Sequence, residues 1–432
     1  MSAQHKRLLH ILARLSAPIL GAMLLASATS SAWARDLYRW VQYVPGGIEA
    51  RAVTDATTCP AAMIDGAAAT MTERSVPGEN YPVRACALPI PKGAKLVTLD
   101  RKPMPLPKER PDRILLIGDT GCRLKGAQVQ DCNDITQWPF RTGADISASF
   151  KPDLVLHVGD MHYRESECPA ERQGCAGTPF GDTWDVWKED FFKPGEALLA
   201  AAPWIMDRGN HEECERGGKG WARVLDPYPF DPTTGVAGCL GPAKPYSVDI
   251  GGVTIVVMDV STAAEKANDK QVALYKPQFE MSKDIIGPVW LTFHRPIWAV
   301  DSQKKGEPAG DNRTLAAAAR NSIPANVQAL ISGHHHTFEL MTYVEDLPLQ
   351  IVSGHGGDDL SLHAPTVVKG LEINGVTVKD GLGRPGVFGF SILERVVDDT
   401  AGLKWTLTGY DIHGWVIAKC HISGRAAACE DK

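Results

Sequence analysis

Apolar runs that stop at a glycine-led polar motif constrain the fold of this chain more than any other feature. Continuous or nearly continuous apolar runs occur at 114–117, 154–158 and 327–332, and less regular ones at 204–206 and 289–293. Such runs are typical of strands that are buried on both faces of a sheet. The segments between them include two plausible helices, 182–199 and 314–320. Strands that alternate with helices in this way predict an α/β fold.

A short polar motif follows each apolar run. Open α/β sheets bind ligands at the carboxyl ends of their strands, so these motifs are the candidate functional residues. In chain order they are Gly118-Asp119-Thr120-Gly121, Gly159-Asp160-Met161-His162-Tyr163, Gly209-Asn210-His211-Glu212, Thr292-Phe293-His294-Arg295-Pro296 and Gly333-His334-His335-His336.

The motifs supply donors for two metal ions that share one carboxylate. We expect Asp160 to bridge the ions. The first ion would be held by Asp119, Asp160, Tyr163 and His336, and the second by Asp160, Asn210, His294 and His334. The first set is rich in anionic oxygens, whereas the second is largely neutral.

Tyr163 indicates which metals the two sets prefer. A free tyrosine has a pKa of about 10, so its ionisation near neutral pH requires a strong Lewis acid. Trivalent iron suits a set with two carboxylates and a phenolate, and a divalent ion suits the neutral set. The sequence therefore predicts Fe(III) paired with Fe(II), Zn(II) or Mn(II).

Paired metal ions indicate a reaction at phosphorus. Two ions about 3.5–4 Å apart stabilise in-line displacement, in which a metal-held hydroxide attacks. Asp160 and His211 are the predicted catalytic residues, with His211 acting on the leaving-group oxygen as a proton or hydrogen-bond donor. His162 and His335 are weaker candidates for contact with the substrate, and His355 is weaker again.

Taken together, the motifs resemble those of the calcineurin-like metallophosphoesterases, and within them the purple acid phosphatases. Three details carry the narrower resemblance: Gly121 where most of the superfamily has histidine, Tyr163 three residues after Asp160, and the Gly-His-x-His motif at 333–336. The resemblance spans roughly 113–353. It implies a two-sheet αββα sandwich, a mixed-valent iron-containing metal pair, the same seven ligands and hydrolysis of phosphate esters at acid pH.

The substrate is less constrained than the site. Arg295 has no role that the motif assigns, and the loop 301–312 has no histidine where plant-type members contact their substrate. We predict an exported acid phosphatase, a metal-dependent phosphoric ester hydrolase, that cleaves phosphomonoesters by attack of a metal-bound hydroxide. Hydrolysis of phosphodiesters, nucleotides or phospholipid head groups is the alternative, and a non-catalytic binding protein is a third.

Four segments are expected along the chain. Residues 1–34 are predicted to be a signal peptide, because basic residues precede an apolar run at 15–28 and an Ala-x-Ala cleavage site; an uncleaved membrane anchor is the alternative. Residues 35–88 are predicted to form a small β-rich domain and 89–112 a proline-rich linker. The catalytic domain is expected at 113–432.

Cysteine content and charge bear on the compartment and the partners. All ten cysteines follow the signal segment, and an even count in an exported chain predicts disulfides. Pairing of neighbours would join 59–86, 122–132, 168–175, 214–239 and 420–429. A periplasmic location is expected, with a eukaryotic secretory route as the alternative.

The net charge of −6 argues against nucleic acid as a partner. A small phosphate ester is the expected partner, and the oligomeric state is open.

Overall fold

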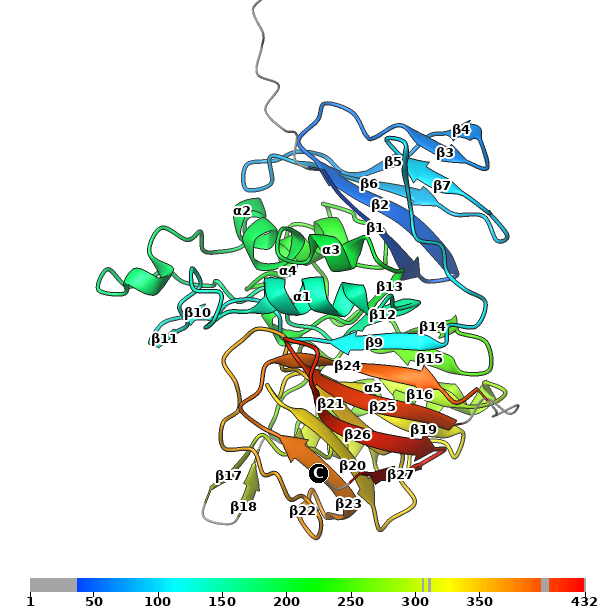
Figure 1. Cartoon of the computed structure of the whole chain (residues 1–432), viewed down its shortest axis with the longest axis vertical. Coiled ribbons are helices and arrows are strands. Elements are labelled where there is room, and N and C mark those ends of the chain that lie inside the picture. The colour runs from blue at the N-terminus through cyan, green and yellow to red at the C-terminus, as the bar shows by residue number, and fades with distance from the viewer. Residues whose placement is uncertain (1–36, 305–306, 310–311, 398–403, 431–432) are drawn as a thin grey trace, which may run out of the picture. The chain divides into compact units, whose positions relative to one another are not determined.

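Two large β-sheets carry the fold in the computed structural model, which describes residues 37–304, 307–309, 312–397 and 404–430 (Figure 1). The predicted signal segment lies outside this part of the chain. The first sheet has eleven strands in the order β27-β26-β25-β24-β9-β12-β13-β1-β2-β6-β5, and the second has eight in the order β14-β15-β16-β19-β21-β20-β23-β22.

The centre of the first sheet is parallel and its flanks are antiparallel. The parallel strands are β9 (Arg113–Ile117), β12 (Leu154–His157) and β13 (Trp204–Met206). On one side follow β24 (Gly389–Arg395), β25 (Lys404–Asp411), β26 (Val416–Ser423) and β27 (Ala426–Cys429). On the other side lie β1 (Leu37–Val44), which pairs with β13 in parallel, and then the antiparallel strands β2 (Gly47–Thr54), β6 (Arg84–Pro89) and β5 (Thr72–Ser75).

The second sheet also has a parallel centre. Its parallel strands are β15 (Thr254–Val257), β16 (Val289–Thr292), β19 (Val327–Ser332) and β21 (Leu349–Ser353). Its antiparallel strands are β14 (Tyr246–Asp249), β20 (Phe338–Tyr343), β23 (Val376–Arg384) and β22 (Glu372–Ile373). Short pairs outside the two sheets are β10 (Leu124–Lys125) with β11 (Gln128–Val129) and β17 (Ser302–Lys304) with β18 (Glu307–Ala309).

Alternation along the strands builds a four-layer αββα sandwich. Ile114 and Leu116 of β9 join a core shared with the second sheet, whereas Leu115 and Ile117 pack among helical residues on the opposite face. The helices on that face are α1 (Phe140–Ser149), α2 (Trp184–Trp187), α3 (Glu196–Leu199) and α4 (Gly218–Gly220). Helices α5 (Asp269–Glu280) and α6 (Arg313–Ala319) cover the outer face of the second sheet. The predicted fold class is confirmed.

The continuous helix expected over 182–199 is wrong. The segment forms α2, a π-helical turn at Lys188–Phe192 and then α3. Pro194 and Gly195 lie between the last two elements, and proline lacks the backbone N–H that a continuous helix requires.

The β-rich N-terminal region is present and extends the first sheet. Strand β1 pairs in parallel with β13, and Trp40 packs its ring 5.6 Å from that of Phe192. A second apolar cluster joins β1, β2 and β6 to β3 (Ala62–Ile64) and β7 (Val97–Leu99). Strand β7 pairs with β8 (Lys102–Pro103) inside the proline-rich stretch, and β4 (Ala67–Ala69) pairs with β3. The domain boundaries at 88 and 112 stay predictions.

All ten cysteines form disulfides, in the same five neighbouring pairs that the sequence predicts: 59–86, 122–132, 168–175, 214–239 and 420–429. Among the described residues, no helix is both long enough and apolar enough to cross a membrane.

Candidate metal centre

The predicted ligands lie just beyond the carboxyl ends of strands in both sheets. Asp119 follows β9 and Asp160 follows β12, and these two strands pair in parallel up to Ile117 and His157. Asn210 begins a short 3₁₀ turn (Asn210–Glu212) after β13. On the second sheet, His294 follows β16, and His334 and His336 follow β19. The parallel register therefore places all five motifs at one edge of the sandwich.

Backbone strain is concentrated at these strand ends. Asp119, Asp160 and His334 have φ values of 55°, 58° and 69°, in the left-handed region that residues other than glycine seldom occupy. Such a conformation costs on the order of 1–3 kcal/mol, and it persists only where the surrounding structure enforces it. The fold therefore orients three of the predicted ligand side chains, and this orientation costs conformational free energy.

The first predicted ligand set forms a tight cluster around the Tyr163 hydroxyl. That oxygen lies 2.8 Å from Asp160 Oδ2, 3.0 Å from Asp119 Oδ1 and 3.1 Å from His336 Nε2. His336 Nε2 is in turn 3.4 Å from Asp119 Oδ1. All four side chains of the set therefore converge on one small volume.

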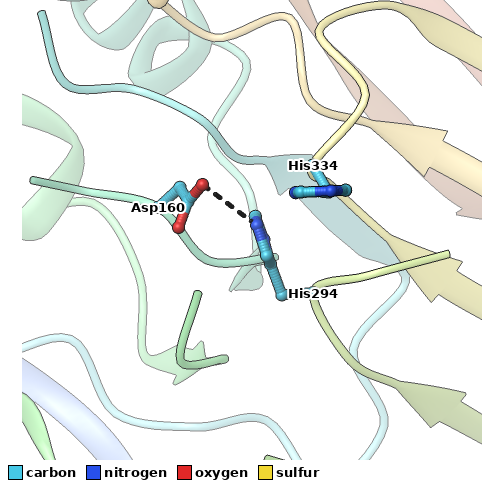
Figure 2. Close-up of side chains that lie close together, drawn as sticks. All are labelled: Asp160, His294 and His334. Atoms are coloured by element: carbon cyan, nitrogen blue, oxygen red, sulfur yellow. Dashed lines mark ion pairs between the residues drawn. The ribbon is translucent and has the colours of Figure 1, made fainter. Parts of the chain in front are cut away.

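The second predicted set shares Asp160 with the first, and Figure 2 shows Asp160 beside His294 and His334. His294 Nε2 lies 3.0 Å from Asp160 Oδ2 and 3.1 Å from Asn210 Oδ1. Asp160, His294 and His334 each offer one ligand atom, and these atoms lie within 4.8 Å of one another. Asp160 Oδ2, which also contacts Tyr163, is thus common to both clusters.

Backbone carbonyl oxygens hold two of the predicted ligand histidines. His294 Nδ1 lies 2.8 Å from the carbonyl oxygen of Val158, and His336 Nδ1 contacts the carbonyl oxygen of Asp359. A backbone carbonyl at Nδ1 favours the tautomer that leaves Nε2 free to bind a metal. In both rings Nε2 is the nitrogen that faces the cluster.

The oxygen donors also fit a metal better than a purely hydrogen-bonded arrangement. A hydroxyl has one hydrogen to donate, whereas the Tyr163 oxygen has three close polar neighbours. Burial and the carboxylates of Asp119 and Asp160 raise the pKa of Tyr163 well above 10, so a phenolate here requires a cation beside it. Donors bound at about 2.0–2.2 Å lie about 3 Å apart when their bonds are at right angles, which matches the observed separations.

Glu212 fixes the loop that carries Asp160. Its carboxylate accepts hydrogen bonds from the backbone N–H groups of Asp160 (3.0 Å), Met161 (2.8 Å), His162 (3.0 Å) and Gly209 (2.9 Å). The side chain is fully buried. Sequence reasoning gave it no role, although it completes the Gly-Asn-His-Glu motif.

A second buried acid supports Tyr163 from the opposite side. Asp190 accepts hydrogen bonds from the backbone N–H groups of Cys122 (3.2 Å) and Tyr163 (2.9 Å), and it pairs with Arg164. Asp190 comes from the π-helical turn that replaces the expected helix. Because no motif surrounds it, the sequence carried no signal for this contact.

An ion pair covers the tyrosine ring. Arg123 lies 4.8 Å from the centre of the Tyr163 ring and pairs with both carboxylate oxygens of Asp358. Asp358 Oδ2 is also 3.6 Å from His336 Nε2. The pair thus contacts two of the predicted ligands, and sequence reasoning missed both of its members.

His211 lies directly against the first cluster. Its ring centre is 3.8 Å from that of Tyr163, and its Nε2 is 3.9 Å from Asp160 Oδ2. Burial lowers the pKa of His211 to about 3, although Asp160 and Glu165 oppose that shift. Glu165 Oε1 lies 2.6 Å from His211 Nδ1 and also pairs with Arg216. A neutral ring whose Nδ1–H faces Glu165 leaves Nε2 as an acceptor, so donation from Nε2 requires the protonated imidazolium.

The three weaker candidates for substrate contact are all buried. His162, His335 and His355 are at most 1% exposed. The His335 ring lies 5.8 Å from that of His334, whereas the His355 ring packs 6.1 Å from Phe338. Contact of these three residues with a substrate stays a prediction.

The family follows from the motifs together with a sequence comparison. Residues 112–338, just over half of the chain, match the family model for the calcineurin-like phosphoesterases. This chain belongs to the calcineurin-like phosphoesterase family. Membership supports the enzyme class that the sequence predicts, a metal-dependent phosphoester hydrolase, and the family implies a dinuclear metal centre.

Individual relatives support the narrower resemblance. Purple acid phosphatase 22 of Arabidopsis thaliana is 23% identical over 236 residues, which cover 52% of this chain and 48% of the relative. The chain therefore spans about half the length of this curated relative.

Solved structures show that the fold is shared. Purple acid phosphatase PPD1 from yellow lupin (Lupinus luteus) superposes with a TM-score of 0.54 and 13% identity over 90% of this chain and 74% of that one. PhoD superposes with a TM-score of 0.52 and 9% identity over 91% and 92% of the two chains. At these identities the likeness concerns the fold alone.

Proposed function

We propose that this member of the family is an exported acid phosphatase that hydrolyses phosphomonoesters at a dinuclear centre. One observation carries the proposal: Asp160 Oδ2 belongs both to the cluster around Tyr163, at 2.8 Å, and to the cluster around His294, at 3.0 Å. A shared carboxylate oxygen between two donor sets is the arrangement that a pair of adjacent ions requires.

The two sets divide the metal ligands by charge. The first ion would be held by Asp119, Asp160, Tyr163 and His336, and the second by Asp160, Asn210, His294 and His334. When bound, the ions would supply Lewis acidity for activation of water and for charge on the phosphoryl oxygens. Tyr163 favours trivalent iron in the first set, and the neutral donors favour Fe(II), Zn(II) or Mn(II) in the second.

The protein's own groups hold and orient the reactants. Glu212 binds the backbone of the Asp160 loop and so fixes the bridging carboxylate. His211 lies beside Tyr163, where its protonated imidazole would donate a proton or a hydrogen bond from Nε2 to the leaving-group oxygen. Glu165 at His211 Nδ1 holds the orientation of that ring.

Export is supported by the disulfides. Five disulfides join all ten cysteines, and such bonds persist in oxidising compartments. A periplasmic or secreted location is therefore proposed, with residues 1–34 removed as a signal peptide. Mass spectrometry of the exported protein should then show a chain that begins near residue 35.

Turnover of two ester classes tests the proposed activity. The purified protein should hydrolyse a phosphomonoester faster than a phosphodiester at acid pH, and chelation of its metals should remove both activities. Asp160→Asn should lose nearly all turnover, because it removes the negative charge at the shared position. Faster cleavage of the diester would favour the phosphodiesterase alternative, and full activity in Asp160→Asn would exclude the bridge.

A further inference from the structure

Arg295 is a charged residue of the fourth motif that the proposed function leaves unused. It follows His294 directly after strand β16, and its side chain is only 11% exposed. Its guanidinium group reaches the second ligand set, where Nη1 lies 3.4 Å from His334 Nε2. The positively charged side chain of Arg295 therefore lies beside a predicted metal ligand.

The guanidinium group of Arg295 is poorly paired. Within the described chain, its polar contacts besides His334 are the Ser261 carbonyl at 3.4 Å, Glu265 at 3.5 Å and Glu213 at 4.0 Å. All lie at or beyond the long end of the hydrogen-bond range. Glu265 is 72% exposed, so that ion pair contributes little in water.

Other arginines around the site are held much more tightly. Arg123 Nε donates to Asp358 at 3.1 Å, and Arg216 Nε donates to Glu165 at 2.7 Å. Each of these two makes a further close contact with the same carboxylate. Arg295 differs from both, since its five N–H donors lack an acceptor at good distance. Buried polar groups are normally hydrogen-bonded, so these N–H donors are available to an acceptor on a bound ligand.

We propose that Arg295 binds non-bridging oxygens of the substrate's phosphoryl group, and this inference rests on the proposed phosphatase function. The planar fork of a guanidinium group matches two phosphate oxygens, and such charge-assisted pairs are among the strongest hydrogen bonds. The second ligand set contains one shared carboxylate among neutral donors, so Arg295 adds positive charge where a phosphate would be attracted.

The same contact selects the class of ester. A phosphomonoester carries a charge of about −1.5 to −2 at pH 7, whereas a diester has one ionised oxygen. Above the second phosphate pKa of about 6, a fixed guanidinium group at the phosphoryl oxygens therefore favours the monoester. Arg295 thus serves as a specificity-determining residue of the site.

Binding of inorganic phosphate tests the inference without turnover. Calorimetry on the metal-loaded protein should show Arg295→Gln binding phosphate about 10- to 100-fold more weakly than the wild type, with the same metal content. Arg172→Gln removes a charge from a side chain that is 48% exposed and should bind phosphate normally. The ratio of kcat/KM for a monoester to that for a diester, measured at pH 7, should also fall in Arg295→Gln.

Unchanged phosphate affinity in a metal-loaded Arg295→Gln protein would overturn the inference, and so would loss of the metals themselves. If Arg295→Gln does not fold, Arg295→Lys is measured instead; it keeps the charge but loses the fork, so wild-type affinity there would also overturn it. A wild type that binds phosphate through Arg295 but cleaves neither ester would contradict the proposed function and leave this contact standing.

Discussion

Tyr163 is a residue at which predicted ligands from the two sheets meet. Its hydroxyl contacts aspartates from two strand ends of the first sheet and a histidine from the second. Burial and those carboxylates raise the phenol pKa well above 10. Ionisation of Tyr163 is therefore coupled to the arrival of a strongly acidic metal.

Tyr163→Phe tests the iron assignment. A phenolate bound to ferric iron absorbs visible light, so the wild type should be coloured and Tyr163→Phe should lose the band. Tyr43→Phe, a half-buried tyrosine in β1, is the matched control and should keep it. A colourless wild type that holds only zinc or manganese would exclude ferric iron while leaving the hydrolase intact.

Glu212 should contribute strongly to stability as well as to the site. Its carboxylate accepts four backbone N–H groups in a fully buried position. Glu212→Gln replaces one acceptor oxygen by an NH₂ group, which leaves buried donors unpaired at a cost of about 2–3 kcal/mol. Urea unfolding should show that loss, whereas Glu215→Gln, at an exposed position, should unfold like the wild type. Equal midpoints for the two variants would contradict this role.

Among single residues, the sequence predicted candidate ligands but not the residues that contact and orient them. The seven predicted ligands belong to motifs that follow apolar runs, so local sequence was sufficient to find them. Asp358 and Arg123 are 235 residues apart in the chain, and only the tertiary fold brings them to Tyr163. Arg295 was visible in its motif, but its loose pairing required coordinates.

A glycine after strand β13 allows two loops of the site to approach closely. A Cβ at Gly209 would overlap the Asp160 side chain and its backbone nitrogen. The loop after β13 can therefore approach the Asp160 loop only because residue 209 has no side chain. That approach is also what allows Glu212 to reach its four donors.

Gly209→Ala should displace Asp160 and abolish metal binding and turnover. The methyl group has no free space, and one of the two loops must move. Gly47→Ala provides a control, because no atom lies within 4 Å of its added Cβ and its φ is not in the left-handed region. Metal content measured on both purified variants checks the prediction. Full occupancy in Gly209→Ala would show that the loops can separate without losing the site.

Helices and strands could be predicted from the sequence where burial on both faces determined them. The apolar runs at 114–117, 154–158 and 327–332 became β9, β12 and β19 because both faces of these strands are covered. The prediction of one helix over 182–199 was wrong because it gave more weight to the apolar pattern than to Pro194 and Gly195, which interrupt the helix. The pairing of β1 with β13 was not foreseeable, since it joins residues 42 and 204.

In the molecule as a whole, the N-terminal strands share an apolar core with the strands that carry the predicted ligands. Tyr38, Trp40 and Val53 belong to the same apolar cluster as Leu115 and Val155. We therefore expect residues 37–430 to unfold in one cooperative transition, even though 35–88 was predicted as a domain of its own.

Trp40→Ala distinguishes a shared core from an independent domain. Trp40 is fully buried, and truncation of such a side chain costs about 3–5 kcal/mol. The urea midpoint for loss of phosphatase activity should fall together with the midpoint from circular dichroism. Trp415→Ala, at a side chain that is 73% exposed, should change neither. An unchanged activity midpoint in Trp40→Ala, with a separate early transition, would establish an independent N-terminal domain.

The number of metal ions per folded chain tests the proposed dinuclear centre. Two donor clusters that share Asp160 Oδ2 should hold two ions in the active protein, and Asp160→Asn should lower the occupancy of both positions together. Elemental analysis of purified, active protein gives this number. Two ions per chain, lost in parallel in Asp160→Asn, is the predicted result. A single ion per chain in protein that hydrolyses phosphomonoesters at full rate would contradict the proposed dinuclear centre.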